Sequence, residues 1–128
     1  MKNIRRIAAG VLAAVAALTP VAAHADTPYA QASAEVDMDG SLIEGSHVTE
    51  AWHPYRGVYC VAVDESVDFT GAVAIHVTPI GEYAAPRSLS VELNPTSACG
   101  EHRLDTIAVY SQVSFRERAD SAFYLSVS

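Results

Sequence analysis

Basic residues are scarce in this chain of 128 residues, and lysine is nearly absent. Lysine and arginine together number 8 against 15 aspartates and glutamates, which gives a net charge of −7 at pH 7. The one lysine, Lys2, lies at the N-terminus with Arg5 and Arg6. An acidic protein is repelled by the phosphates of nucleic acids and by anionic lipid surfaces. The composition therefore excludes nucleic acid as an expected partner and favours a neutral or basic one.

No apolar run is long enough to span a membrane. The longest one covers the twelve residues 7–18, whereas a membrane-spanning helix needs about 20. The three basic residues precede this run, and Ala23-His24-Ala25 follows it with the small-x-small pattern of a cleavage site. This order predicts a secretory signal peptide over residues 1–25 and no membrane anchor after its cleavage. We therefore expect a secreted protein, either extracellular or associated with the cell envelope.

Removal of the signal peptide would leave one small domain. Residues 26–128 keep five arginines and all fifteen acidic residues, which is a net charge of −10. Residues 26–33 are small and polar and predict a flexible N-terminal lead-in. We expect a single β domain over residues 34–128, because about 100 residues is an ordinary size for one domain.

Cysteine is also rare, since Cys60 and Cys99 are the only two in the chain. An even number of cysteines in an exported protein indicates a disulfide, with a reactive thiol or a metal ligand as the alternative. A Cys60–Cys99 disulfide would close a loop of roughly 40 residues and stabilise the fold by about 4 kcal/mol in the chain-entropy model. That is a large share of the ~5–15 kcal/mol that keeps a small domain folded.

Helical periodicity is missing after residue 33. Apolar and polar residues instead alternate with the period of two that is typical of half-buried strands. The windows that show this pattern, or an apolar run of strand length, are 47–52, 58–63, 72–78, 88–93, 105–111 and 123–127. Segments rich in glycine, proline and asparagine separate these windows. The sequence predicts an all-β fold, an antiparallel β-sandwich or barrel-like domain of about six to eight strands with one disulfide.

Three of these windows predict which residues face the core. Residues 58–63 are apolar throughout, which suits a strand that is covered on both faces. His76 alternates with core residues and should face the outer side of its strand. The alternation in window 47–52 places Val48, Glu50 and Trp52 on one side.

The usual motifs of catalysis and metal binding are absent. No serine lies in a Gly-x-Ser-x-Gly pattern, and fifteen scattered carboxylates single out no catalytic pair. The histidines after residue 25 are not spaced as zinc ligands; they are His47, His53, His76 and His102. The sequence therefore assigns no catalytic residue, no metal ligand and no cofactor. It argues against an enzyme without excluding one, and a small secreted hydrolase stays an alternative.

The segment 37–41 partly resembles a calcium-binding loop. Asp37 and Asp39 stand at alternate positions before Gly40. In that register Ser46 takes the last position, where calcium loops need a glutamate, and no helix is expected on either side. An Asp-Gly turn after a strand accounts for the segment better. Whether this turn binds a metal is not decided by the sequence.

Trp52, Tyr55 and Arg56 form the candidate binding surface. These residue types are enriched at binding hot spots, and an aromatic pair can also stack on a sugar ring. The alternative is that Trp52 closes the end of the core while Tyr55 and Arg56 lie in a turn. We expect a non-enzymatic binding or interaction domain whose partner is an extracellular protein or a glycan.

Residues 94–103 form the longest stretch without a strand pattern, and they contain Cys99. Several small secreted protease inhibitors present a rigid loop that a disulfide holds in place. An extracellular protease or glycosidase inhibitor that acts through residues 94–103 is therefore the alternative function. The simpler interpretation is a long connection that carries the disulfide.

Four short motifs occur in a recognisable order. They are AEVDMDGSL at 34–42, GSHV at 45–48, RGVYCV at 56–61 and DSAFYLSV at 120–127. This order resembles small exported β proteins of actinobacteria, of uncharacterised function, that share the patterns V-x-x-D-G-x-L, G-x-x-V, G-x-Y-x-V and D-x-x-F-x-L-x-V. The resemblance implies an all-β fold and supplies no catalytic or binding residues.

Overall fold

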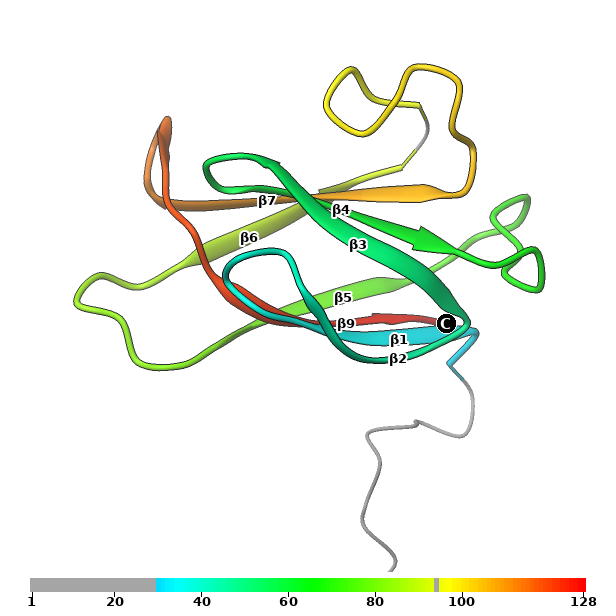
Figure 1. Ribbon diagram of the computed structural model, residues 1–128, viewed down its shortest axis with the longest axis horizontal. Helices are drawn as coiled ribbons and strands as arrows, with labels where there is room; N and C mark the ends of the chain where they lie inside the picture. Colours follow the sequence, from blue (N-terminus) through cyan, green and yellow to red (C-terminus); the bar gives the residue numbers. More distant parts are fainter. Residues whose placement is uncertain (1–29, 94) are drawn as a thin grey trace, which may run out of the picture.

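The protein is a sandwich of two antiparallel sheets (Figure 1). A computed structural model describes residues 30–93 and 95–128, so the predicted signal peptide lies outside the described residues. The described part of the chain contains nine strands and no helix, and hence no helix that is able to cross a membrane. The predicted all-β antiparallel fold is confirmed.

The first sheet has four strands in the order β2-β1-β9-β5. They are β1 (Ala32–Val36), β2 (Leu42–Ser46), β5 (Ile75–Ile80) and β9 (Ala122–Val127). Strands β1 and β2 form a hairpin whose turn contains Gly40 at a φ of 90°, a conformation that favours glycine. The predicted Asp-Gly turn is thus confirmed. Because β1 begins at Ala32, the last two residues of the expected lead-in belong to the sheet.

The second sheet has five strands, with the order β3-β4-β7-β6 and a short β8 that pairs with β7. They are β3 (Val48–Tyr55), β4 (Val58–Val63), β6 (Ser88–Glu92), β7 (Thr106–Ser114) and β8 (Glu117–Arg118). The predicted window 58–63 coincides with β4. The window 72–78 begins too early, since β5 starts at Ile75.

The core lies between the two sheets and follows the predicted alternation. Every second residue of β1 and β9 is buried, as are the inward residues of β4 and β7. The inward residues of these strands are Ala32, Ala34, Val36, Tyr59, Val61, Val63, Ile107, Val109, Phe123, Leu125 and Val127. Burial of each large apolar side chain contributes about 1.5–3 kcal/mol, so this layer is the main source of stability.

Tyr59 is the largest fully buried side chain, and it connects both sheets. Its ring stacks on His53 at 4.4 Å between ring centres and meets the edge of Phe123 at 5.3 Å. Its hydroxyl donates to the carbonyl of Met38 at 2.7 Å and accepts from the backbone N–H of Ser121 at 3.1 Å. The phenol thereby joins β4 to the β1–β2 turn and to the segment that leads into β9.

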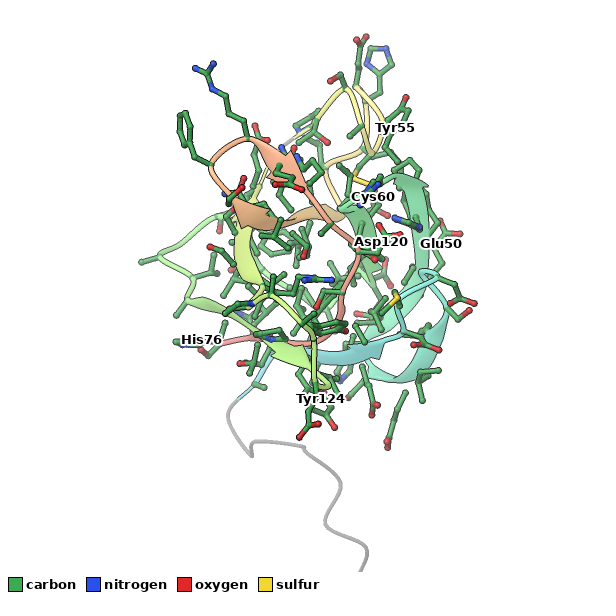
Figure 2. The ribbon with its side chains drawn as sticks, turned by 90° about the vertical axis from the view of Figure 1, so that its left-hand side faces the viewer. Glu50, Tyr55, Cys60, His76, Asp120 and Tyr124 are labelled. Atoms are coloured by element: carbon green, nitrogen blue, oxygen red, sulfur yellow. A yellow bond between two sulfur atoms is a disulfide. The ribbon has the colours of Figure 1, made fainter. Side chains whose placement is uncertain are left out.

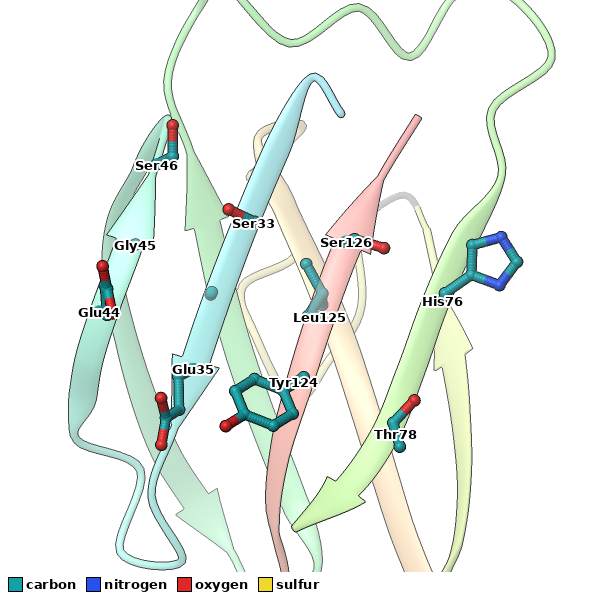
Figure 3. A pocket seen from close by; sticks show the side chains of 11 residues that line it. Ser33, Glu35, Glu44, Gly45, Ser46, His76, Thr78, Tyr124, Leu125 and Ser126 are labelled. Atoms are coloured by element: carbon teal, nitrogen blue, oxygen red, sulfur yellow. The ribbon is translucent and has the colours of Figure 1, made fainter. Parts of the chain in front are cut away.

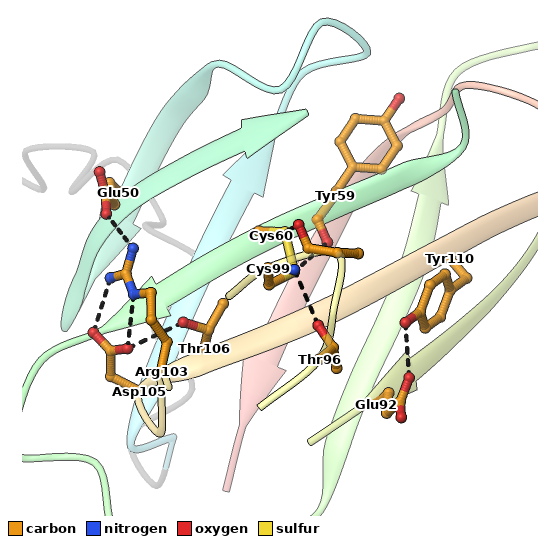
Figure 4. The surroundings of a disulfide bond; sticks show 11 residues. Glu50, Tyr59, Cys60, Glu92, Thr96, Cys99, Arg103, Asp105, Thr106 and Tyr110 are labelled. Atoms are coloured by element: carbon orange, nitrogen blue, oxygen red, sulfur yellow. Dashed lines mark hydrogen bonds and ion pairs between the residues drawn. A yellow bond between two sulfur atoms is a disulfide. The ribbon is translucent and has the colours of Figure 1, made fainter. Parts of the chain in front are cut away.

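All six residues of β4 are buried, because a second layer covers its outer face. Cys60 forms a disulfide with Cys99, and the two are 0% and 6% exposed (Figure 4). The disulfide holds residues 95–105, here called the covering segment, over the outer face of the five-stranded sheet. Trp52, Ala98 and Tyr110 pack against the same cluster. The predicted disulfide and the predicted coverage of residues 58–63 on both faces are confirmed.

The prediction that Val48 and Trp52 point to the same side of β3 is wrong. Val48 and Ala51 pack against the core, whereas Trp52 packs on the outer face against the disulfide. The pairing of β3 with β4 slips between Val48 and Glu50, which indicates a bulge. A bulge adds one residue and reverses the alternation after it, so Val48 and Trp52 point to opposite faces.

Replacement of both cysteines by alanine should destabilise the domain. The disulfide joins residues 39 apart, so its loss should lower the free energy of unfolding by roughly 2–4 kcal/mol. Urea unfolding followed by circular dichroism measures this change. Addition of a reductant is the control, since it should destabilise the natural protein and leave the double variant unchanged. Equal stability of the two proteins would show that the covering segment is held without the disulfide.

Tyr59 should make the fold sensitive to alkaline pH. Burial raises the pKa of Tyr59 from 10.0 to about 12, because a charged phenolate is poorly solvated in the core. In the unfolded chain this group ionises from about pH 10. The contribution of the neutral phenol to the free energy of unfolding is therefore complete below pH 10 and is lost as the pH rises to about 12.

Urea unfolding between pH 8 and 12 tests whether Tyr59 causes the loss of stability at alkaline pH. The natural protein is compared with two variants, Tyr59→Phe and Tyr55→Phe. Tyr59→Phe should be less stable at pH 8 by about 1–3 kcal/mol, because the backbone N–H of the buried Ser121 and the carbonyl of Met38 lose their partner. Its stability should then fall less steeply with pH than that of the natural protein. Tyr55→Phe removes an exposed phenol and should follow the natural profile. If the natural protein and Tyr59→Phe fall in parallel, the alkaline transition arises elsewhere.

Candidate functional site

The two outer faces of the sandwich differ. The covering segment lies on the five-stranded sheet, whereas the outer face of the four-stranded sheet is hollowed into a groove of about 410 Å³ (Figure 3). This volume is within the range of about 300–1,000 Å³ that is usual for small-ligand sites. We call this hollow the outer groove, and all four strands of the sheet contribute to it.

Strand register places the side chains of the outer groove in two rows. Each row takes one residue from β2, β1, β9 and β5, in that order across the sheet. The first row is Ser46, Ser33, Ser126 and His76, and the second is Glu44, Glu35, Tyr124 and Thr78. Residues that are directly opposite on neighbouring strands lie about 4.5–5.5 Å apart, so each row is a continuous strip of polar groups.

Differences in side-chain size explain why this face is hollow. The serines of the first row are short and leave space above the sheet. Tyr124 and the two glutamates of the second row are longer, and His76 stands at the β5 edge (Figure 3). Tyr124 is 45% exposed, so part of its ring is available to a ligand.

The chemistry of the outer groove suits a polar ligand that has an apolar face. Hydroxyls of three serines and a threonine both donate and accept hydrogen bonds, and the two carboxylates accept them. The ring of Tyr124 adds a surface for stacking. An entirely apolar ligand would cover these polar groups without replacing their bonds to water, at a cost of about 1–3 kcal/mol for each group.

A serine, a histidine and an aspartate also meet elsewhere, but not as a catalytic triad. His47 Nδ1 lies 3.0 Å from Asp64 Oδ2 and 2.9 Å from the hydroxyl of Ser66. The Ser66 hydroxyl also donates to Asp64, and this bond is the main cause that lowers the pKa of Asp64. A triad needs the serine and the acid on different ring nitrogens. Here both contact Nδ1, so the cluster links the β2–β3 turn to the end of β4.

The carboxylates of the β1–β2 turn are engaged in the turn itself. Asp37 Oδ1 accepts the N–H of Met38 at 2.7 Å, and Asp39 Oδ1 accepts the N–H of Ser41 at 2.9 Å. Hydrogen bonds from Ser41 also lower the pKa of Asp39. Within residues 30–93 and 95–128, no group of three or more His, Cys, Asp or Glu side chains is arranged to hold a metal ion.

The three residues of the predicted binding surface have different surroundings. Trp52 packs against the disulfide cluster and lies under the guanidinium of Arg103, 4.9 Å from its ring centre. Tyr55 is 64% exposed at the end of β3, and Arg56 lies in the β3–β4 turn. Figure 2 shows Tyr55 on the opposite side of the molecule from Tyr124. Tyr55 and Arg56 are thus accessible, whereas Trp52 has a packing role.

The covering segment is folded into turns, with residue 94 outside the described residues. Gly100 N–H donates to the carbonyl of Thr96 at 2.9 Å, and Cys99 N–H donates to the Thr96 hydroxyl at 3.1 Å. Arg103 contacts Asp105 through two hydrogen bonds, which hold the pKa of Asp105 below its usual range (Figure 4). A segment that binds a protease as an added strand offers free backbone groups, whereas the backbone N–H groups of Cys99, Gly100 and Arg103 donate within the segment.

Sequence reasoning placed His76 on the outer face but missed the rest of the outer groove. Ser33 and Glu35 were assigned to the lead-in and to a sequence motif, and Tyr124 to a C-terminal strand. The alternation of each strand carries a signal for its outward residues. The alternation does not show that β1 pairs with β9, and this pairing brings Glu35 beside Tyr124.

No protein-family model, no curated protein and no solved structure matches this chain. The resemblance to small exported actinobacterial β proteins therefore stays a prediction. Any assignment of function rests on the geometry of the described residues.

Substitution of Trp52 should affect stability rather than recognition. Trp52→Ala removes a half-buried ring beside the disulfide and should lower the free energy of unfolding by about 2–3 kcal/mol. Tyr55→Ala changes an exposed side chain and should stay within about 0.5 kcal/mol of the natural protein. Urea unfolding of both variants measures the difference. Equal stability of the two variants would return Trp52 to the candidate binding surface.

Proposed function

We propose that this protein is an exported, non-enzymatic binding domain that holds a saccharide in the outer groove. The observation that supports the proposal is the asymmetry of the sandwich. One outer face is closed by the covering segment and its disulfide, and the other is open and lined by two rows of polar side chains around Tyr124.

A saccharide fits the outer groove better than an apolar molecule or a protein surface. Sugar rings carry hydroxyls around their rim and C–H groups on their faces, so they match hydroxyl and carboxylate groups beside an aromatic ring. A stable protein interface buries about 800 Å² on each partner, which is far more than a hollow of this size provides alone. A glycan was one of the two partner classes expected from the sequence.

Export is part of the proposal and rests on two features. Residues 1–25 have the order of a secretory signal peptide. The Cys60–Cys99 disulfide is consistent with an oxidising compartment outside the cytoplasm. Together they support a site of action outside the cell or at the cell envelope.

The two alternative functions find less support among the described residues. The covering segment is folded into turns, which does not favour a protease inhibitor that acts through residues 94–103. The arrangement of His47, Asp64 and Ser66 does not favour a hydrolase. Tyr55 and Arg56 are exposed and stay a second candidate surface, for an extracellular protein partner.

Substitution of Tyr124 tests the proposed site. The natural protein is screened against an array of oligosaccharides, and the best ligand is then measured by calorimetry. Tyr124→Ala should weaken binding ten- to hundredfold, because loss of a stacked ring costs about 1.5–3 kcal/mol. Tyr124→Phe keeps the ring and should bind within a few-fold of the natural protein.

Tyr55→Ala is the matched control, since it removes an exposed tyrosine on the opposite side of the molecule. It should leave saccharide binding unchanged. Failure of every saccharide to bind, or an equal loss in Tyr55→Ala and Tyr124→Ala, would rule out the outer groove as a saccharide site.

A further inference from the structure

Two turns at one end of the sandwich form an exposed surface that is separate from the outer groove. They are the β3–β4 turn and the β7–β8 hairpin, which lie at the same end of the molecule (Figure 1). A Cβ atom at Gly57 would lie 3.0 Å from Cβ of Arg118, so the β3–β4 turn packs directly against β8. Five exposed side chains of these turns are here called the arginine surface: Tyr55, Arg56, Phe115, Arg116 and Arg118.

The positive charge of the described residues is concentrated on the arginine surface. Residues 30–128 carry five arginines and no lysine, and three of the five belong to this surface. These three form no ion pair with another described residue, whereas Arg103 binds Glu50 and Asp105. The carboxylates nearby each accept a hydrogen bond from the protein itself, in the pairs Ser114–Glu117, Gly57–Asp120 and Tyr110–Glu92. The three guanidinium groups are therefore open to a partner.

The tip of the β7–β8 hairpin lacks the residues that its backbone favours. Phe115 and Arg116 form the turn between the paired residues Ser114 and Glu117. Two-residue hairpin turns favour glycine, asparagine and aspartate, and the φ of 66° at Arg116 lies in the left-handed region. The ring of Phe115 is 85% exposed and lies outside the core. The fold explains neither side chain, which points to a role in recognition.

We infer that the arginine surface docks into an acidic cleft of another protein, with Phe115 inserted in an apolar part of that cleft. Guanidinium groups bind carboxylates through paired, charge-assisted hydrogen bonds. Arginine, tyrosine and phenylalanine are also the residue types enriched in protein interfaces. Docking through this surface and saccharide binding in the outer groove do not depend on each other, because the two sites share no residue.

The charge of the remaining surface orients the approach of such a partner. The chain has a net charge of −7. The β4–β5 loop carries Asp64, Glu65 and Asp68 without a basic residue, and it lies at the opposite end because β4 runs from the β3–β4 turn to this loop. An acidic cleft is repelled by that end and attracted by the arginine surface. The uneven charge thus favours one orientation of the protein.

An acidic polysaccharide offers the same carboxylates but fits this surface less well. A hairpin tip is convex, so the hollow has to be on the partner, and an extended polysaccharide chain has no such hollow. Sugar rings also stack on open aromatic faces, whereas the guanidinium of Arg116 already covers one face of Phe115, 4.9 Å from the ring centre. The observations therefore favour a protein partner.

Two variants of the hairpin tip separate a docking role from a structural one. Arg116→Gly suits the left-handed backbone, and Phe115→Ser removes an exposed ring. Both variants should unfold at the same urea concentration as the natural protein or at a higher one. A loss of stability in either variant would show that the tip serves the fold, and it would overturn the inference.

The probe for the partner is a displayed library of random peptides, each closed by a disulfide. Peptides that bind the triple variant Arg56→Gln, Phe115→Ser, Arg116→Gly are first removed, and the rest are selected on the natural protein. The selected peptides should combine aspartate or glutamate with aromatic or aliphatic residues. Their binding should weaken as salt is added, as expected for ion pairs at a surface.

Calorimetry of the best peptide measures the contribution of each side chain. Phe115→Ser and Arg116→Gly should each weaken binding at least tenfold, because truncation of an aromatic or arginine hot spot commonly has a larger effect. Arg56→Gln should weaken it at least threefold. Tyr124→Ala is the matched control and should keep the peptide affinity, since Tyr124 lies on the opposite side of the molecule from Tyr55 (Figure 2).

Three results of the selection overturn the inference. They are a selection without enrichment, selected peptides that lack acidic residues, and equal binding of the best peptide by the natural protein and Arg116→Gly. Tighter binding of polygalacturonate than of the best peptide assigns the surface to an acidic polysaccharide and also overturns it. Each of these results leaves saccharide binding in the outer groove intact, and Arg116→Gly should retain that binding.

Discussion

The buried phenol of Tyr59 is the contact on which the arrangement of the two sheets depends. It belongs to the five-stranded sheet, yet its hydroxyl bonds to backbone groups at the β1–β2 turn and at the entry to β9. Strands β1, β2 and β9 carry six of the eight side chains in the two rows of the outer groove. A single buried side chain on one sheet thus positions most of the candidate site on the other.

The disulfide also lies away from the outer groove, on the opposite outer face of the sandwich. By holding the covering segment on the five-stranded sheet, Cys60 and Cys99 bury an outer face that would otherwise be largely apolar around Ala108 and Trp52. The four-stranded sheet lacks such a cover, and most of the outward residues in its two rows are polar, with the ring of Tyr124 among them. The difference between the two outer faces therefore follows from side-chain chemistry. The outer face of the five-stranded sheet is covered and forms a second small core, whereas that of the four-stranded sheet is open to a ligand.

The sequence patterns predicted well which side of a strand each residue points to. They did not predict which strands pair with each other. The alternation in window 123–127 matches the burial of Phe123, Leu125 and Val127, and the alternation in window 72–78 placed His76 outside, since the direction of a side chain depends only on its own strand. It failed in β3, where a bulge reverses the phase before Trp52. It also left the outer groove undetected, because the placement of Glu35 opposite Tyr124 depends on pairing between the first and the last strand in the sequence. The composition of Trp52, Tyr55 and Arg56 indicated recognition, but composition does not distinguish a packed tryptophan from an exposed tyrosine.

The regular alternation of buried and outward residues in β1 and β9 has a consequence for how this protein can change over evolution. In β1 and β9, each residue of the two rows stands between two residues that build the core, and its own side chain points away from the core. Substitutions at groove positions such as Ser33 or Ser126 therefore alter the ligand surface with little effect on folding. Selection can act on ligand preference and on stability almost independently, and related domains can diverge in what they bind while the sandwich is retained.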